Sequence, residues 1–232
     1  MSRIFITGST DGLGRAAAGL LMREGHDVVL HARSRERAAA LSDLTPGAAG
    51  VVIGDLSSAS ETREIADQVN EIGRMNAVIH NAGVYLEPSR GTTAEGHAKT
   101  LAVNTLAPYM LTALVDRPDR LIYLSSGMHH AGAGSLRDID WTMRRWNAAQ
   151  AYSESKLHIT ALALALARLA GSPQQRRRSG LGPDQDGRRS DRRPEAGIPY
   201  PDVARRQRRS CRNRKRRLLV PPAAADARTR SP

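Results

Sequence analysis

Short apolar runs alternate with longer amphipathic stretches along the first 170 residues. The runs predict strands, and the stretches, in which apolar residues recur every three or four positions, predict helices. The expected strands are Arg3–Thr7, Asp27–Ala32, Gly50–Gly54, Ala77–Asn81 and Arg120–Ser125, and the expected helices are Gly14–Glu24, Arg35–Leu44, Ser60–Ile72, His97–Val115 and Gln150–Ala170. Apolar strands that alternate with helices form a parallel sheet with helices on both faces. The pattern therefore predicts an α/β fold with a doubly wound, Rossmann-type sheet.

A glycine-rich turn joins the first expected strand to the first expected helix. Right-handed crossovers place the C-terminal ends of all the strands at one edge of the sheet, where such folds bind ligands. Glycines let the backbone approach a pyrophosphate, whose charge is stabilised by amides at the helix N-terminus. The alternative is a turn that only packs strand against helix. We expect the turn to bind a dinucleotide through Gly8, Ser9, Thr10, Gly12, Leu13 and Gly14.

After the glycine-rich turn, Tyr152 and Lys156 are the second feature of the sequence that indicates a chemical function. Their spacing places both side chains on one face of the last expected helix. A phenol with a pKa of about 10 is a poor acid–base catalyst at neutral pH, and a neighbouring ammonium favours its ionised form. Such a pair occurs often by chance on helix surfaces. Downstream of a glycine-rich turn, it predicts an enzyme that transfers protons.

The charge of the chain changes after Ala170. Basic and acidic residues balance over residues 1–170, so the net charge of +12 arises from residues 171–232, which are rich in Arg and Pro. That segment lacks apolar periodicity and cannot bury enough surface to offset its ordering entropy, which predicts disorder. A basic arm for nucleic acid is an alternative, but Tyr200 is its single aromatic residue, which disfavours base stacking. We therefore divide the chain into domain 1–170 and tail 171–232.

Several further motifs follow the expected strands in a fixed order, and together they resemble the classical short-chain dehydrogenase/reductase family. The segment Asp138 to Asn147 is similar to the retinol-dehydrogenase-like branch of that family. His80 departs from the family pattern, in which many members have a second Asn at this position. The matching positions are Asp55, Asn81-Ala82-Gly83, Asn104, Ser125-Ser126, Tyr152 and Lys156.

The resemblance implies roles for four catalytic residues. Tyr152 would donate a proton to a carbonyl oxygen during reduction, or accept one during alcohol oxidation. Lys156 would lower the pKa of Tyr152 and bind the nicotinamide ribose. Ser126 would stabilise charge on the substrate oxygen, and Asn104 would hold a water that relays protons to Lys156. His129 and His130 lie nearby without accompanying carboxylates or cysteines, so we expect loop residues and no metal site.

The end of the second expected strand bears on the choice of cofactor. An acidic residue there would favour NAD(H), but the chain has Arg33, whose guanidinium can pair with a 2′-phosphate. We therefore expect NADP(H), with NAD(H) as the alternative. The other interpretation of the arginines is that Arg33 and Arg35 simply begin the next helix in solvent. The resemblance also implies that Asp55 and Leu56 contact the adenine, and that Asn81, Ala82, Gly83, Tyr152 and Lys156 contact the cofactor.

The family pattern also predicts a sixth strand and a Pro-Gly turn after the Tyr152 helix, which this reading frame lacks. When Gln175 to Gly187 are back-translated and each codon is read from its second base, the segment can become Asn-Ala-Val-Asp-Pro-Gly-Trp-Val-Pro-Thr-Lys-Met-Gly. This is the sequence type that the branch would have there. We hypothesise that residues from about Gly171 onward are an out-of-frame translation, through a sequencing error or a genuine frameshift. The alternative is a true basic extension.

These patterns together predict an NADP(H)-dependent oxidoreductase that acts on a small-molecule carbonyl or alcohol. The alternatives are an inactive dinucleotide-binding remnant and, less favoured, a nucleic-acid-binding protein. No apolar stretch reaches the roughly 20 residues of a membrane span, Met1 runs almost directly into the first expected strand without a basic-then-apolar pattern, and Cys211 is the single cysteine. We expect a cytoplasmic location and, from the family, a homodimer or homotetramer.

Overall fold

The computed structural model describes residues 1–171 of the 232-residue chain. The predictions of a disordered or nucleic-acid-binding tail and of a change of frame fall on residues 171–232, so beyond Gly171 they lie outside the described residues. In the described part, no helix is both long enough and apolar enough to cross a membrane.

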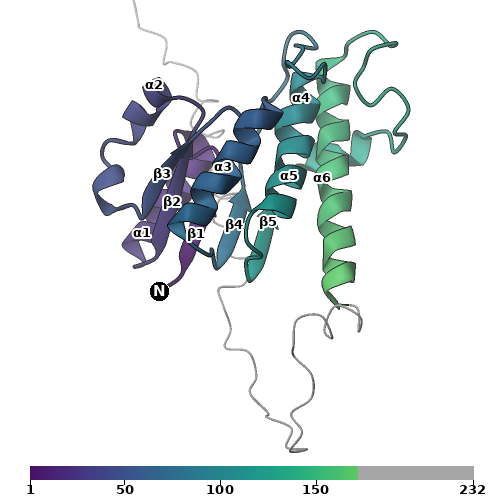
Figure 1. Ribbon diagram of the computed structural model, residues 1–232. Helices are drawn as coiled ribbons and strands as arrows, with labels where there is room; N and C mark the ends of the chain where they lie inside the picture. The colour runs from purple at the N-terminus through teal and green to yellow at the C-terminus, as the bar shows by residue number, and fades with distance from the viewer. Residues whose placement is uncertain (172–232) are drawn as a thin grey trace, which may run out of the picture. The chain divides into compact units, whose positions relative to one another are not determined.

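A parallel sheet forms the centre of the described part, with its strands in the order β3–β2–β1–β4–β5 (Figure 1). Phe5 at its centre pairs with Val29 on one side and Val78 on the other. The predicted strands and the doubly wound, Rossmann-type fold are confirmed, although most strands end a residue or two earlier than expected. The strands are β1 (Arg3–Ile6), β2 (Asp27–Ala32), β3 (Gly50–Ile53), β4 (Ala77–His80) and β5 (Arg120–Tyr123).

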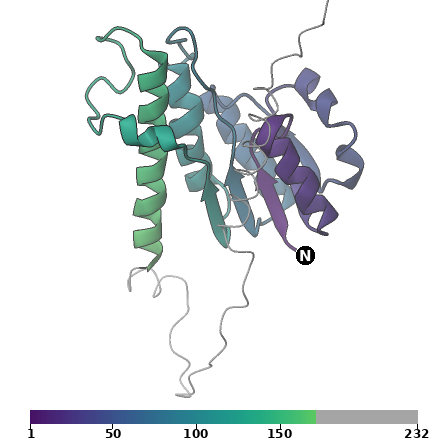
Figure 2. The ribbon, with the colours of Figure 1, turned by 180° about the vertical axis from the view of Figure 1, so that it is seen from behind.

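Helices cover both faces of this sheet. In Figure 1, α3 and α5 lie in front of the strands, and the reverse view in Figure 2 shows α1 in front. Helix α6 runs beside β5 and contacts α4. The helices are α1 (Gly12–Arg23), α2 (Arg35–Ala38), α3 (Ala59–Ile72), α4 (Lys99–Leu101), α5 (Ala107–Leu114) and α6 (Ala148–Gly171).

Each face of the sheet has its own apolar core, because successive side chains of a strand point to opposite faces. Burying each large aliphatic or aromatic side chain stabilises the fold by roughly 1.5–3 kcal/mol. The core under α3 and α5 includes Phe5, Val29, Val78, Ile65, Val69 and Leu111, and the core under α1 includes Ile4, Ile6, Val28, Leu30, Ala18 and Leu41.

The predicted helix over residues 35–44 is much shorter in the structure. Helix α2 begins after Ser34, whose hydroxyl accepts a hydrogen bond from the Arg37 amide at 3.3 Å, and it ends at Ala38. A 3₁₀ turn, η1 (Ala39–Leu41), follows. Within residues 35–41 Leu41 alone is buried, so the segment lacks the apolar face that stabilises a longer helix.

The predicted helix over residues 97–115 contains a π-helical turn, η3 (Ala102–Leu106), between α4 and α5. Pro108 gives a physical reason, because it lacks the amide that would bond to the Asn104 carbonyl in an α-helix. Isolated π turns occur often at functional sites. This one contains Asn104, one of the predicted catalytic residues.

His80 at the end of β4 makes a prediction about acid stability. It is buried, it stacks on Tyr123 with ring centroids 4.7 Å apart, and burial lowers its pKa to about 3. In the unfolded chain His80 therefore binds a proton near pH 6.5, whereas in the folded chain it binds one only near pH 3. The free energy of unfolding should fall as the pH drops from about 6.5 toward 3, by at most about 1.4 kcal/mol per pH unit from this residue.

Urea unfolding of His80→Asn at several pH values checks this prediction. The variant should lose part of the slope between pH 6.5 and 4, whatever its absolute stability. His130→Asn, at an exposed position, should keep the slope of the unmodified protein. An unchanged slope in His80→Asn contradicts the prediction.

Candidate active site

The C-terminal ends of β1 and β4 are joined by side-chain hydrogen bonds. The Asn81 amide donates to the carbonyl oxygens of Thr7 at 2.9 Å and of Gly8 at 3.0 Å. The Thr7 hydroxyl accepts from the backbone amides of Asn81 and Ala82, each at 3.0 Å. These contacts hold the glycine-rich turn against the segment after β4, at the place where strand order reverses and doubly wound folds bind ligands.

The glycines of the turn provide room for close backbone approach. Gly8 has a φ of +67°, and a Cβ there would lie 3.0 Å from the Ala82 Cα. Gly12, the first residue of α1, has a φ of +53°, and no atom of the described residues 1–171 lies within 4 Å of the place that its Cβ would take. The backbone at the N-terminus of α1 is therefore open to an anionic ligand.

Three other predicted residues of the turn differ in their exposure. Ser9 is fully buried and donates to the Ile6 carbonyl at 2.6 Å, so its hydroxyl stabilises the turn from inside. Thr10 is half-buried, and its hydroxyl accepts a 3.4 Å bond from Arg37. Leu13 is 42% exposed at the start of α1.

Gly14 provides a direct test of this turn. A Cβ at this position would collide with the Gly8 carbonyl oxygen and with the Asn81 side-chain amide. We expect Gly14→Ala to lower the free energy of unfolding by about 1–3 kcal/mol, as overpacking does, and to weaken nucleotide binding. Gly134→Ala, where the added methyl meets open space, is the matched control. Thermal melting with and without NADP⁺ measures both effects, and equal behaviour of the two variants contradicts the prediction.

His31 is a structural residue of the site that sequence reasoning did not assign. Its Nδ1 accepts from the Gly8 amide at 2.9 Å, and its Nε2 donates to the Gly54 carbonyl at 2.9 Å. Both bonds require a neutral imidazole, and burial lowers the pKa of His31 accordingly. This side chain therefore links the ends of β1, β2 and β3.

The residues expected to hold the adenosine end of the cofactor lie directly after β2 and in the turn after β3. Arg33 is exposed directly after β2. Asp55 accepts a 2.8 Å hydrogen bond from the Ser57 amide, which fixes the turn after β3. Leu56 is only 5% exposed and packs in the core beneath α3, so little of its surface is available to a ligand.

Tyr152 and Lys156 lie on the face of α6 that is near the end of β5. The Lys156 ammonium donates to the Leu124 carbonyl at 2.8 Å and lies 5.6 Å from the centre of the Tyr152 ring. A Cβ on Gly83 would lie 3.6 Å from the Lys156 ammonium and 3.2 Å from the Asn104 side-chain oxygen. The segment after β4, the π turn and α6 therefore meet at one point.

Burial affects the ionisation of both residues. It lowers the pKa of Lys156 to about 8 and raises the pKa of Tyr152, while the Ser126 side chain acts on Tyr152 in the opposite direction. The pKa of Tyr152 thus moves away from neutrality, contrary to the shift predicted from Lys156. Burial is the largest cause of this shift, and the Lys156 ammonium is bonded to the Leu124 carbonyl instead of to the phenol.

The side chain of Asn104 connects three elements. Its oxygen accepts from the Val84 amide at 2.8 Å, and its amide donates to the Val84 carbonyl and to the Ser155 hydroxyl, each at 3.0 Å. The Ser155 hydroxyl donates in turn to the Tyr152 carbonyl at 2.8 Å. Both amide protons of Asn104 are therefore bonded within the protein, to Val84 and to Ser155.

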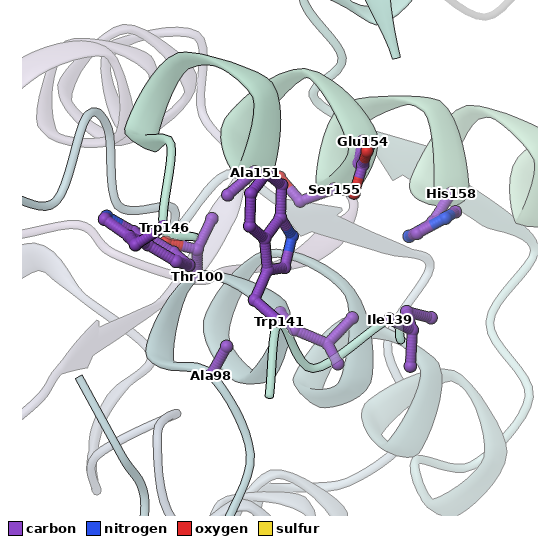
Figure 3. A pocket seen from close by; sticks show the side chains of 10 residues that line it. Ala98, Thr100, Ile139, Trp141, Trp146, Ala151, Glu154, Ser155 and His158 are labelled. Carbon is purple, nitrogen blue, oxygen red and sulfur yellow. The ribbon is translucent and has the colours of Figure 1, made fainter. Parts of the chain in front are cut away.

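The opposite face of α6 carries the buried carboxylate of Glu154, which is labelled in Figure 3 and forms an ion pair with Arg144. The Arg144 guanidinium donates to both carboxylate oxygens of Glu154, at 2.9 and 2.6 Å, and lies 3.6 Å from the centre of the Trp141 ring. Arg144 belongs to residues 138–147, a segment that we call the strap. The strap contacts α6 on the side away from Tyr152. A small pocket beneath it is lined by Ala98, Thr100, Leu101, Ile139, Trp141, Trp146, Ala151, Glu154, Ser155 and His158.

The structure therefore brings most of the predicted residues together along one edge of the sheet. One group of residues in contact is Gly8, Asn81 and Ala82. A second group, beside Tyr152, is Gly83, Asn104 and Lys156. Sequence reasoning missed the residues that support this arrangement. They are Thr7, His31, Tyr85, Arg144, Glu154 and Ser155, of which only Thr7 has a sequence signal, its place at the end of a strand that enters the glycine turn.

A doubly wound parallel sheet with a glycine turn and a Tyr–Lys helix at the same edge defines the Rossmann-type class of oxidoreductase. The family model described as short chain dehydrogenase matches residues 2–133. The chain is 46% identical to an uncharacterized oxidoreductase of Emericella nidulans, over 75% of this chain and 67% of the relative. The chain belongs to the short-chain dehydrogenase family.

Two other curated relatives support the same assignment. A short-chain dehydrogenase of Gibberella zeae is 45% identical over 72% of this chain and 66% of its own length. Human retinol dehydrogenase 13 is 34% identical over 73% of this chain and 55% of its own length, which agrees with the predicted branch. The matched part thus spans about two thirds of the fungal relatives and about half of the human one.

Solved structures show the same fold. A crystal structure of a protein from Mycobacterium paratuberculosis has a TM-score of 0.66 and 30% identity, and covers 75% of this chain and 65% of that one. A short-chain dehydrogenase from Sphingobium yanoikuyae, solved in complex with NADPH, has a TM-score of 0.56 at 23% identity, over 73% and 66% of the two chains.

Proposed function

We propose that the protein is an NADP(H)-dependent oxidoreductase that interconverts a carbonyl compound and an alcohol. The observation that carries this proposal is the position of Tyr152 and Lys156 at the sheet edge that also holds the glycine turn. Residues 1–170 form the nucleotide-binding and catalytic domain in this proposal. A cytoplasmic location and assembly into a dimer or tetramer remain predictions.

The residues at the sheet edge fit a nicotinamide dinucleotide. The open backbone at Gly12 and the N-terminus of α1 suit its pyrophosphate, and the exposed guanidinium of Arg33 suits a 2′-phosphate. Lys156, next to Gly83, suits the nicotinamide ribose. When bound, the nicotinamide supplies the hydride.

Proton transfer is the contribution of the protein itself. Tyr152 would donate its phenolic proton to the substrate oxygen during reduction, and Ser126 would donate a hydrogen bond to the same oxygen. Lys156 would need a partner other than the Leu124 carbonyl to come closer to the phenol. The ribose hydroxyls of a bound cofactor would offer such a partner, so the pKa of Tyr152 should fall on cofactor binding.

The test is consumption of NADPH and NADH with a panel of ketones and aldehydes. We expect NADPH to be preferred, and Arg33→Ala to remove that preference without loss of NADH-dependent turnover. Binding of NADPH without turnover of any carbonyl would instead favour an inactive dinucleotide-binding protein. No binding of either nucleotide overturns the proposal.

A further inference from the structure

The ring of Tyr85 lies against the ring of Tyr152. The two ring centroids are 4.7 Å apart and the rings are inclined at 81°, which is the edge-to-face arrangement that aromatic pairs favour. Tyr85 is nevertheless 60% exposed, so much of this residue is accessible to a ligand. An aromatic surface therefore extends from the proposed proton donor into solvent.

The backbone around Tyr85 is held in place from both sides. Val84, which precedes it, exchanges two hydrogen bonds with the Asn104 side chain. Leu86, which follows it, has a φ of +50°, which is uncommon for a residue with a side chain. The Glu87 carbonyl accepts from the Trp146 indole at 3.0 Å. Tyr85 is thus presented by a fixed segment, and a fixed ring loses little entropy when a ligand binds.

The surroundings of this aromatic surface are partly apolar and disfavour a cationic ligand. Leu86, beside Tyr85, is 41% exposed and apolar. The acidic side chains closest in sequence to the two tyrosines are each paired, Glu87 with Lys99 at 3.2 Å and Glu154 with Arg144 at 2.6 Å. Small-molecule sites commonly combine such apolar and aromatic walls with a few polar groups at the reacting atom.

We propose that Tyr85 determines substrate specificity and that the substrate carries a planar aromatic ring on its carbonyl or carbinol carbon. The ring would lie against the exposed surface of Tyr85 while the oxygen reaches the Tyr152 hydroxyl. This inference rests on the proposed function, because it assigns a substrate class to the same site. Aromatic contacts of this kind change binding by about three- to tenfold.

The test compares acetophenone with cyclohexyl methyl ketone, which has a similar size but no planar ring. We expect Tyr85→Ala to lower the ratio of kcat/KM values, acetophenone over cyclohexyl methyl ketone, by about three- to tenfold. The intrinsic reactivities of the ketones cancel when this ratio is compared between variants. Tyr85→Phe should retain the ratio, and so should Tyr109→Ala, which removes a tyrosine of similar exposure on α5. A ratio unchanged in Tyr85→Ala overturns the inference.

A binding measurement separates this inference from the proposed function. Titration calorimetry with acetophenone in the presence of NADP⁺ should show weaker binding to Tyr85→Ala than to Tyr85→Phe, even if no ketone is turned over. Absent turnover then counts against the proposed function alone. Equal affinities for acetophenone in the two variants count against Tyr85 as a specificity residue.

Discussion

Replacing Tyr152 with phenylalanine is expected to lower kcat by about 10²–10⁴-fold, the range that a positioned acid or base contributes. The substitution removes one hydroxyl and leaves the ring that contacts Tyr85 and Lys156. Since the hydroxyl takes part in proton transfer, the affinity for NADPH should change little. Steady-state kinetics and NADPH titration measure the two quantities separately.

Tyr109→Phe, on the exposed side of α5, is the control for this prediction. It should leave kcat unchanged. A Tyr152→Phe protein that retains kcat within about a factor of two would remove Tyr152 from the proposed chemistry. A loss of NADPH binding would show instead that the substitution disturbs the cofactor site.

Among the substitutions considered, removal of the Arg144 side chain should lower the free energy of unfolding the most. In Arg144→Ala, the Glu154 carboxylate, only 4% exposed, loses its bidentate partner, and Trp141 loses the cation above its ring. Breaking a buried ion pair by removing one partner costs about 3–5 kcal/mol. Because Arg144 is itself 35% exposed, we expect Arg144→Ala to lower the free energy of unfolding by about 2–4 kcal/mol. Urea unfolding measures this loss.

Arg145→Ala is the matched control, since the neighbouring arginine is exposed. It should change stability by less than about 0.5 kcal/mol. The double variant Arg144→Met with Glu154→Leu should recover much of the loss, because the buried Glu154 charge is removed together with its partner. Equal destabilisation by Arg144→Ala and Arg145→Ala would show that the strap does not stabilise α6.

Much of the fold could be predicted from the sequence because local signals and tertiary packing agree. The strands are continuous apolar runs, and the glycine turn opens a helix immediately after the first of them. The shorter α2 and the π turn were not predicted. The first depends on how little of residues 35–41 is buried, and the second on Pro108, whose missing amide affects a carbonyl four residues earlier.

The candidate site was predictable where a motif names its residues and unpredictable where support comes from distant segments. Tyr152 and Lys156 share a helix face through their spacing alone. His31 shows no comparable signal, because its role depends on Gly8 and Gly54, each 23 residues away. Arg144 and Tyr85 lie in two loops, and their contacts with α6 depend on how these loops fold. The raised pKa of Tyr152 likewise follows from burial, which spacing does not reveal.

The most direct test of the central claim is transfer of deuterium to a ketone from NADPH that carries deuterium at both C4 positions of the nicotinamide, followed by mass spectrometry of the alcohol. If Tyr152 and Lys156 serve a nicotinamide reductase, the alcohol formed by the unmodified protein should carry one deuterium on its carbinol carbon. Tyr152→Phe should form it at least about a hundredfold more slowly. An alcohol without deuterium, or none formed while labelled NADPH binds, would contradict the account.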